Sequence, residues 1–146
     1  VVIVARDYAE KYTGATNLEE ACCIIHDHGA LIAGVTDGAN GSYFVWPDGT
    51  TYRCQPFPQD SVVDTTGAGD SFHGAFLSKL AVSIRQENAL YGEFIKPIDI
   101  LQSLDHKQLE SAAIFASAVS ALNTQGIGGR SALPSLKSAC NLAGLE

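Results

Sequence analysis

Residues 63–76, VDTTGAGDSFHGAF, carry the strongest chemical signal in the chain. Small residues at positions 67–69 precede Asp70, and an apolar stretch with helical spacing follows. A glycine-lined turn that opens a helix leaves backbone N–H groups unpaired, and the helix dipole adds positive potential there, so the turn is suited to bind phosphate. Asp70, beside such a site, could take the proton of a substrate hydroxyl. This is the chemistry of phosphoryl transfer to an alcohol.

Other glycine-rich motifs do not fit this stretch. The dinucleotide pattern GxGxxG fails because Phe72 stands at its third glycine, and the P-loop pattern GxxxxGK[ST] fails because Ala75 and Phe76 replace its last two residues. The GxSxG nucleophile elbow is absent from the sequence. An ordinary capped helix would explain Asp70 alone. It would not explain the whole set of small and acidic residues in the turn, which comprises Asp64, Gly67, Ala68 and Gly69.

The N-terminal part of the chain has the spacing of an α/β unit. Continuous apolar and β-branched residues predict two buried strands, at 1–4 and 30–36. Between them we expect a helix over 7–13 and another that Thr16 or Asn17 caps. Strand, helix and strand in this order predict parallel strands in a βαβ arrangement.

The rest of the chain supplies a hairpin and helices around the glycine-lined turn. Pro-Asp-Gly separates two predicted strands, 42–46 and 51–54, which form the hairpin. No internal domain boundary is evident. The remaining predicted elements are a short strand at 62–63, a helix from Gly69 to about Ile84, an irregular polar segment over 85–106, a helix over 107–123 and a short helix that starts at Pro134.

Composition narrows the class of protein. The 146 residues are 46% hydrophobic and 17% charged, which is typical of one folded domain. The net charge of −7 argues against a nucleic-acid partner, because phosphate backbones attract patches of Lys and Arg. The four cysteines form no CxxC pair, which favours free thiols in a reducing cytosol. No apolar run reaches the length of a membrane span and no signal peptide opens the chain, so we expect a cytoplasmic protein without a membrane partner.

The stretch DTTGAGDSF closely resembles the C-terminal signature of the PfkB, or ribokinase-like, carbohydrate kinases. The resemblance implies an α/β ribokinase-like fold, with a mostly parallel sheet flanked by helices in a three-layer arrangement. Residues 1–146 would be the C-terminal part of a single kinase domain. Because the chain opens on a strand-like apolar run and contains no Met, we expect a fragment of a longer protein.

The same resemblance implies roles for the residues of the turn. Asp70 would be the catalytic base, and the backbone amides of Gly67, Ala68 and Gly69 would form the anion hole for the transferred phosphoryl group. Asp64 and Thr66 stand at positions whose carbonyls help to bind a monovalent cation, K⁺, in some members of the family.

Two further loops resemble nucleotide-binding loops of the family. Residues 36–41, TDGANG, are similar to its TxGxxG loop, which contacts ATP phosphates and ribose, and residues 123–131 resemble the loop that closes over adenine and the cation. A plain turn would also explain the first loop, and a helix stop the second. The implied nucleotide-binding residues are Thr36, Gly38, Gly41, Asn123 and Gly126.

One family motif is missing. Many members carry Asn-x-x-Glu, whose Glu acts on Mg²⁺ through water, but the alignment places Ala5 and Tyr8 at those positions. Asp7 is a candidate substitute. The stretches ARDYAEKYTG and PDGTTYRCQPFP resemble ketohexokinase-type members, whereas GIGGRSALP is more similar to bacterial sugar kinases. These similarities favour a ketose or a related sugar as substrate.

The implied activity is transfer of the γ-phosphoryl group of ATP to a sugar hydroxyl, with Mg²⁺ as a cofactor. Sugar specificity in the family resides mainly in the N-terminal half, so an adenosine-type nucleoside kinase remains an alternative. A non-catalytic nucleotide-binding scaffold is a second alternative, because the Asn-x-x-Glu motif is lost. The isolated 146 residues are expected to be inactive, and the full-length protein to form a homodimer through a lid that these residues lack.

Four other side chains have less specific interpretations. His73 follows Asp70 by three residues, but packing or surface exposure explains it better than a second base. Phe44 and Trp46 favour packing within the hairpin. For Arg130, contact with a nucleotide phosphate or substrate and a plain surface charge remain equally open.

Overall fold

The computed structural model describes residues 1–91 and 95–145, and it divides the chain into two compact units, Val1–Pro58 and Gln59–Glu146. The division falls at the proline-containing connection between the hairpin and the glycine-lined turn. That residues 1–146 belong to a single kinase domain stays a prediction. No helix in the described ranges combines the length and apolar character that crossing a membrane would require.

The first unit contains a four-stranded sheet and two α-helices. Its elements are β1 (Val2–Ala5), α1 (Arg6–Thr13), α2 (Leu18–Asp27), β2 (Ala33–Thr36), a 3₁₀ turn (Gly38–Asn40), β3 (Ser42–Val45) and β4 (Thr51–Cys54). The strand order is β1-β2-β3-β4, with β1 and β2 parallel and the other two pairs antiparallel. The parallel pair and the antiparallel hairpin are confirmed. The described sheet is mixed, because parallel pairing is confined to β1 and β2.

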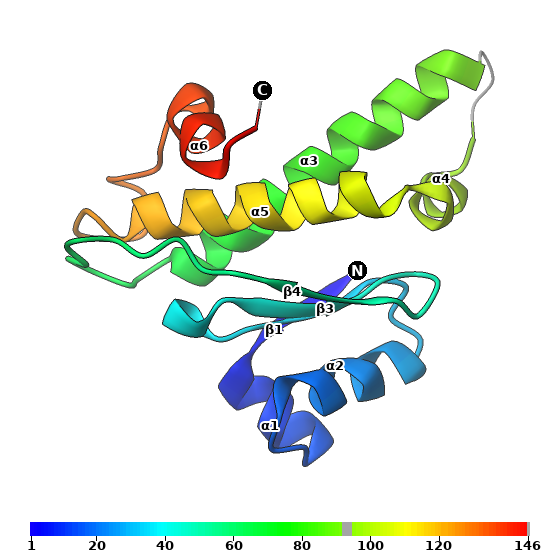
Figure 1. The fold of residues 1–146 in the computed structure, drawn as a ribbon, viewed down its shortest axis with the longest axis horizontal. Coiled ribbons are helices and arrows are strands. Elements are labelled where there is room, and N and C mark those ends of the chain that lie inside the picture. The colour runs from blue at the N-terminus through cyan, green and yellow to red at the C-terminus, as the bar shows by residue number, and fades with distance from the viewer. Residues whose placement is uncertain (92–94, 146) are drawn as a thin grey trace. The chain divides into compact units, whose positions relative to one another are not determined.

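The core of this unit lies between the sheet and its helices. Figure 1 shows α1 and α2 on one face of the sheet. Ile25 of α2 clusters there with Val35 and Val45 from neighbouring strands, and all three are buried. Asn17 is the residue that caps α2, because its side chain accepts the N–H of Glu20 at 2.8 Å and thereby satisfies one free donor of the first turn.

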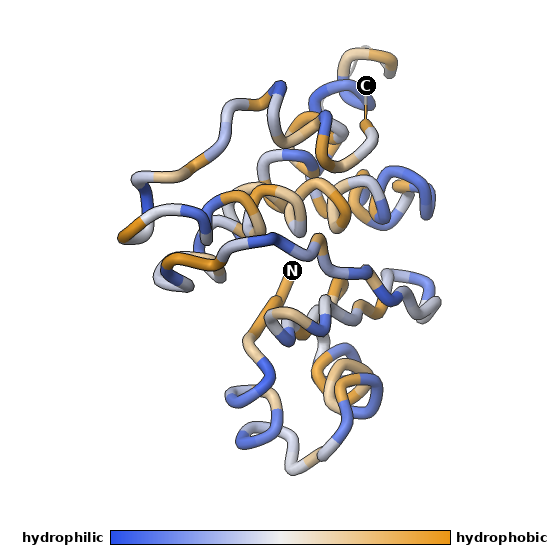
Figure 2. The backbone as a smooth tube through the Cα atoms, turned by 60° about the vertical axis from the view of Figure 1, so that its left-hand side comes forward, coloured by the Kyte–Doolittle hydropathy of each residue, from blue (hydrophilic) through white to orange (hydrophobic). Residues whose placement is uncertain are grey.

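The second unit is helical. Its elements are α3 (Ala68–Tyr91), α4 (Pro97–Ser103), α5 (His106–Asn123) and α6 (Leu136–Ala143). α3 packs along α5, and α6 packs on α5 (Figure 1). The predicted apolar face of α3 is confirmed, since Phe72, Phe76 and Leu80 are all buried. Figure 2 shows hydrophobic and hydrophilic residues mixed along the helices.

Several predicted elements are corrected by the structure. α3 continues past Ile84 to Tyr91, and α4 lies inside the segment that was expected to be irregular. Pro97 opens α4 because proline at the first helical position loses no hydrogen bond. Residues 62–63 form no strand, because the N–H of Val63 donates instead to the carbonyl of Thr124 at 2.8 Å. Residues 92–94 lie outside the described residues.

The first strand also differs from expectation. The sequence predicts a strand buried on both faces, but Val1 and Val2 are 44% and 41% exposed. The reason is that β1 is an edge strand of the described sheet, so neighbours cover it on one side only.

Phe44 and Trp46 behave as predicted, since their rings stack within the hairpin region with centroids 4.9 Å apart.

Phe76→Ala is expected to lower the free energy of unfolding by about 3–5 kcal/mol, because it removes a fully buried ring from α3 and leaves a cavity. Urea unfolding of the full-length protein, followed by circular dichroism, measures the change. Leu77→Ala is the matched control on the same helix: Leu77 is 50% exposed, and its loss should cost at most about 0.5 kcal/mol. Equal losses in the two variants would contradict the described packing.

Candidate active site

The turn before α3 can be formed only by glycine at position 67. Gly67 has φ 76°, and a Cβ there would lie 2.5 Å from the Cα of Gly129. The turn is also anchored to the helices. The carbonyl of Ala68 accepts hydrogen bonds from the hydroxyls of Ser71 and Ser120, each at 2.9 Å, and Ser120 belongs to α5. The start of α3 is therefore fixed against both α5 and the loop that follows α5.

The backbone N–H groups of this turn are mostly free. The N–H of Ala68 donates to the carbonyl of Thr65 at 3.1 Å. Within the described part of the chain, the N–H groups of Gly67, Gly69 and Asp70 have no protein acceptor. These three are available to an anion at the positive end of the helix dipole. A contribution from Ala68, as the sequence predicts, requires the turn hydrogen bond to Thr65 to be given up.

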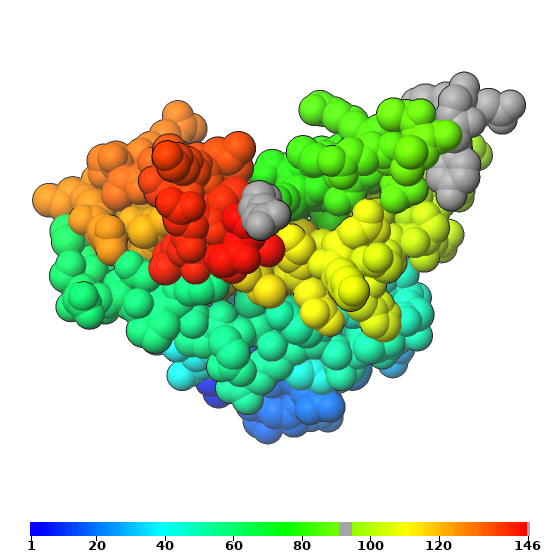
Figure 3. Space-filling view, turned by 45° about the horizontal axis from the view of Figure 1, so that its top comes forward, coloured from blue at the N-terminus to red at the C-terminus, as the bar shows by residue number. Residues whose placement is uncertain are grey.

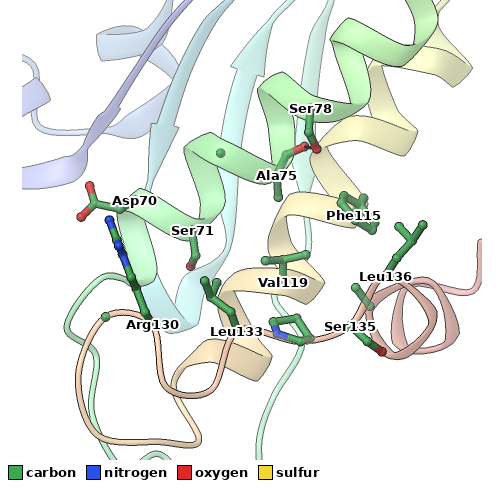
Figure 4. A pocket seen from close by; sticks show the side chains of 14 residues that line it. Asp70, Ser71, Ala75, Ser78, Phe115, Val119, Arg130, Leu133, Ser135 and Leu136 are labelled. Carbon is green, nitrogen blue, oxygen red and sulfur yellow. Dashed lines mark hydrogen bonds between the residues drawn. The ribbon is translucent and has the colours of Figure 1, made fainter.

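Asp70 lies in the first turn of α3 and is exposed. It lines a pocket of about 500 Å³, and Figure 4 shows its carboxylate on the same side of α3 as the guanidinium of Arg130. His73 is half-buried and its Nδ1 lies 2.9 Å from the carbonyl oxygen of Gly69, while its role stays a prediction. The carboxylate of Asp70 is thus the group of this turn that a substrate can reach.

Asp64 has a structural task that the sequence does not reveal. Its Oδ1 accepts the N–H of Thr66 and its Oδ2 accepts the N–H of Gly128, both at 2.8 Å. Hydrogen bonds from the Thr66 side chain, the Thr66 N–H and the Gly128 N–H hold the pKa of Asp64 below its usual value. The side chain of Asp64 therefore joins two loops, while its carbonyl remains the group predicted to bind a cation.

Asn123 ends α5 beneath the second glycine-rich loop. It is fully buried, and its Nδ2 donates to the carbonyl of Gly129 at 3.4 Å. Among the described residues no donor reaches its Oδ1. Gly126 is packed closely as well, because a Cβ there would lie 2.8 Å from Ala132 Cβ. Asn123 and Gly126 therefore support the conformation of the second glycine-rich loop. Any effect of Asn123 on nucleotide binding would act through the position of this loop.

The pocket continues from Asp70 between α3, α5 and α6, and Figure 3 shows the surface hollowed between the segments that form α3 and α6. The part of the pocket away from Asp70 is apolar and includes the buried Phe115 and the exposed Leu136. Lys79 lies over the Phe115 ring, with its Nζ 5.0 Å from the ring centroid. Sequence reasoning missed these lining residues, because an isolated aromatic in a helix of small residues carries no motif.

The TDGANG loop is held within the first unit by its own side chains. Thr36 donates through Oγ1 to the carbonyl of Val4 at 3.5 Å. Asp37 Oδ2 accepts hydrogen bonds from Arg6 Nη1 and Asn40 Nδ2, each at 3.1 Å. Asp37 and Asn40 occupy variable positions of the TxGxxG pattern, and these contacts give both a structural role.

The glycines of this loop fit the positions that the sequence predicts for them. Gly38 and Gly41 have φ of 51° and 88°, which disfavours a side chain, and a Cβ at Gly41 would also lie 2.3 Å from the carbonyl oxygen of Cys54. Thr36, Gly38 and Gly41 therefore belong to one ordered loop in the first unit. The turn at 67–70 and the loop that Asn123 supports belong to the second unit.

No metal cluster exists in the described ranges, since no three His, Cys, Asp or Glu side chains gather to hold an ion. Asp7, the candidate substitute for the missing motif, is exposed in the first turn of α1 and is not part of such a group.

Gly67→Ala is expected to lower the free energy of unfolding by about 1–3 kcal/mol, because it forces positive φ on a side chain and pushes Cβ into Gly129. Chemical denaturation measures the loss. Gly74→Ala is the control within α3, where a Cβ meets nothing within 4 Å, and it should stabilise by about 0.5–1 kcal/mol. Destabilisation by both substitutions alike would argue against the close approach of the two loops.

Asp64 is expected to make stability depend on pH. A carboxylate with a lowered folded pKa stabilises the fold above its unfolded value of 3.8, and the contribution is lost as pH falls through the folded pKa. Asp64→Asn should therefore lower Tm at neutral pH, and the difference from wild type should shrink in acid below pH 3.8. Thermal unfolding across this range tests the idea, with Asp7→Asn as the exposed control. A difference that does not change with pH would refute it.

Comparison with known proteins identifies the family. Residues 1–136 match the model of the pfkB family carbohydrate kinases. An inositol 3-kinase from Oryza sativa subsp. japonica is 34% identical over 105 residues, which are 68% of this chain and 24% of that protein. The chain thus spans about a quarter of the length of this curated relative.

Solved structures share the fold. A fructokinase double mutant from Vibrio cholerae O395, bound to fructose, ADP and potassium ion, superposes with a TM-score of 0.75 at 24% identity, over 97% of this chain and 40% of that one. The aminoimidazole riboside kinase from Salmonella enterica, complexed with aminoimidazole riboside and an ATP analogue, gives 0.73 at 26% identity, over 97% and 41%. The α/β ribokinase-like fold is therefore confirmed, and the chain belongs to the pfkB family of carbohydrate kinases.

Proposed function

We propose that the full-length protein transfers the γ-phosphoryl group of ATP to a hydroxyl group of a sugar, with a ketose or a related sugar as the acceptor class. One observation carries the proposal. The exposed carboxylate of Asp70 adjoins a turn whose N–H groups at Gly67 and Gly69 have no acceptor among the described residues, and it opens onto a pocket of about 500 Å³. A base beside an anion site is what this reaction needs.

The residues of the second unit have different roles in the proposed reaction. Asp70 takes the proton of the attacking hydroxyl. The free N–H groups at the start of α3 donate to the oxygens of the transferred phosphoryl group, where negative charge develops, and the helix dipole adds to this stabilisation. The apolar side of the pocket, at Phe115 and Leu136, offers a surface on which a purine can stack. In the first unit, Thr36, Gly38 and Gly41 are proposed as nucleotide-binding residues on the resemblance of their loop to the family's TxGxxG loop.

The site is compatible with Mg²⁺ that binds together with ATP. Mg²⁺ is usually held by substrate phosphates and few carboxylates, so it does not require a protein cage, and the described residues form none. When bound, it neutralises charge on the phosphates during transfer. The chain's own share is then to hold the phosphoryl group at the turn and to keep Asp70 beside it.

A monovalent cation also fits the chain. The carbonyls of Asp64 and Thr66 are oxygen ligands of the kind that K⁺ prefers. The buried Oδ1 of Asn123 lacks a donor among the described residues, and such an orphan costs about 1–3 kcal/mol unless an ion or water satisfies it. The potassium-bound fructokinase from Vibrio cholerae supports the assignment by similarity of fold.

A nucleoside acceptor is the second candidate. The observation in its favour is the structural similarity to the Salmonella enterica kinase, which was solved with aminoimidazole riboside, a ribose derivative that carries a base. The inositol 3-kinase and the fructokinase favour plain polyols and sugars instead. A panel of acceptors therefore has to contain both classes.

Asp70→Asn is expected to lower kcat by roughly 10²–10⁴-fold, because it removes the general base but keeps the shape of the side chain. ADP release by the full-length protein with MgATP, screened over ketohexoses, aldoses, polyols, sugar acids and nucleosides, measures it. Asp99→Asn, which removes an exposed carboxylate from α4, is the control and should keep full activity. Nucleotide binding without turnover on any acceptor would instead indicate a non-catalytic scaffold.

A further inference from the structure

Arg130 shares the pocket with Asp70. Of the residues that line this pocket, Asp70 and Arg130 are the ones with charged side chains. Figure 4 shows the long side chain of Arg130 extending from the loop after α5 towards the first turn of α3, so that its guanidinium points at the carboxylate of Asp70. A positive group therefore stands on the side of the pocket where phosphoryl transfer is proposed to occur.

The backbone at Arg130 is held in place by several contacts. The preceding residue, Gly129, lies so close to Gly67 that a Cβ on Gly67 would be 2.5 Å from its Cα. The N–H of Gly128 donates to Asp64 at 2.8 Å, and the carbonyl of Arg130 itself accepts the N–H of Leu133 at 3.3 Å. The loop thus fixes Arg130 beside the free N–H groups of the turn, independently of where its side chain points.

The guanidinium itself has no protein partner in the described part of the chain, since it takes part in no hydrogen bond or salt bridge there. Arg6 provides the contrast, because its guanidinium is bound by Glu10 at 2.7 Å and Asp37 at 3.1 Å. An arginine fork matches two oxygens of a phosphoryl group and binds them more strongly than neutral donors do. An unpaired fork beside free backbone N–H groups is therefore suited to the same anion.

We propose that Arg130 is a further catalytic residue, which binds non-bridging oxygens of the γ-phosphoryl group and stabilises their charge during transfer. The inference rests on the proposed kinase function. In the reaction the acceptor oxygen bonds to the γ-phosphorus while the bond from phosphorus to the β,γ-bridging oxygen breaks, and ADP leaves with that electron pair. The hydroxyl proton goes to Asp70. Arg130 stays protonated throughout and contributes hydrogen bonds and charge.

The test combines binding and turnover in the full-length protein. Arg130→Gln should lower kcat/KM with MgATP by on the order of 10²-fold, the effect of losing one donor to a developing oxyanion. It should weaken binding of β,γ-imido-ATP about 10-fold and leave AMP binding unchanged, because AMP lacks the γ-phosphate. Arg130→Lys should recover part of the loss, because lysine keeps the charge but not the fork. Calorimetry gives the affinities.

Arg85→Gln is the charge-matched control. Arg85 is exposed on α3 and does not line the pocket, so its loss should change neither affinity nor turnover. If wild type binds β,γ-imido-ATP and Arg130→Gln binds it equally well and turns over normally, the role of Arg130 is overturned while the kinase function stands. An equal loss for AMP and β,γ-imido-ATP would also overturn it, because Arg130 would then not act on the γ-phosphate. A wild-type protein that neither binds nucleotide nor turns over would overturn the proposed function itself.

Discussion

The close approach of Gly67 to Gly129 is the constraint on which the candidate site depends. Two backbone segments that are far apart in the sequence come so near that a Cβ on Gly67 would lie 2.5 Å from the Cα of Gly129. The contact sets the position of the loop after α5 against the start of α3. Asp64 and Asn123 maintain it, one by accepting the N–H of Gly128 and the other by donating to the carbonyl of Gly129. The pocket at Asp70 therefore depends on groups that do not line it.

Two carboxylates of the same stretch have opposite environments, and this separates their tasks. Asp64 receives hydrogen bonds from two backbone N–H groups, which lower its pKa and keep it ionised as a structural acceptor. Asp70 is exposed at the pocket and accepts no protein hydrogen bond in the described part of the chain. A carboxylate that already holds N–H donors is poorly placed to take a substrate proton, so Asp70 is the better candidate for the base.

Local pattern was enough to predict the elements around the site, but not their long-range contacts. The strand at 51–54, the Asn17 cap and the buried face with Phe76 follow from spacing and turn chemistry within a few residues. The sequence does not predict the helix α4, because the polar composition of residues 85–106 favours an irregular segment. The burial of Asn123 and the partner of Asp64 were missed because each depends on a residue brought close by the fold. A glycine motif predicts that a turn exists, not which backbone lies against it.

In the first unit, an ion-paired arginine lies beside the position of the missing Asn-x-x-Glu motif. Arg6 lies next to Ala5, the position of the lost Asn, and its guanidinium binds both Glu10 and Asp37. These acidic side chains neutralise an arginine and hold the TDGANG loop, so they are not free to act on a metal ion. In the proposed reaction, Glu10 and Asp37 are thus engaged by Arg6, and Mg²⁺ would be held mainly by the phosphate oxygens of ATP, as is usual for this ion.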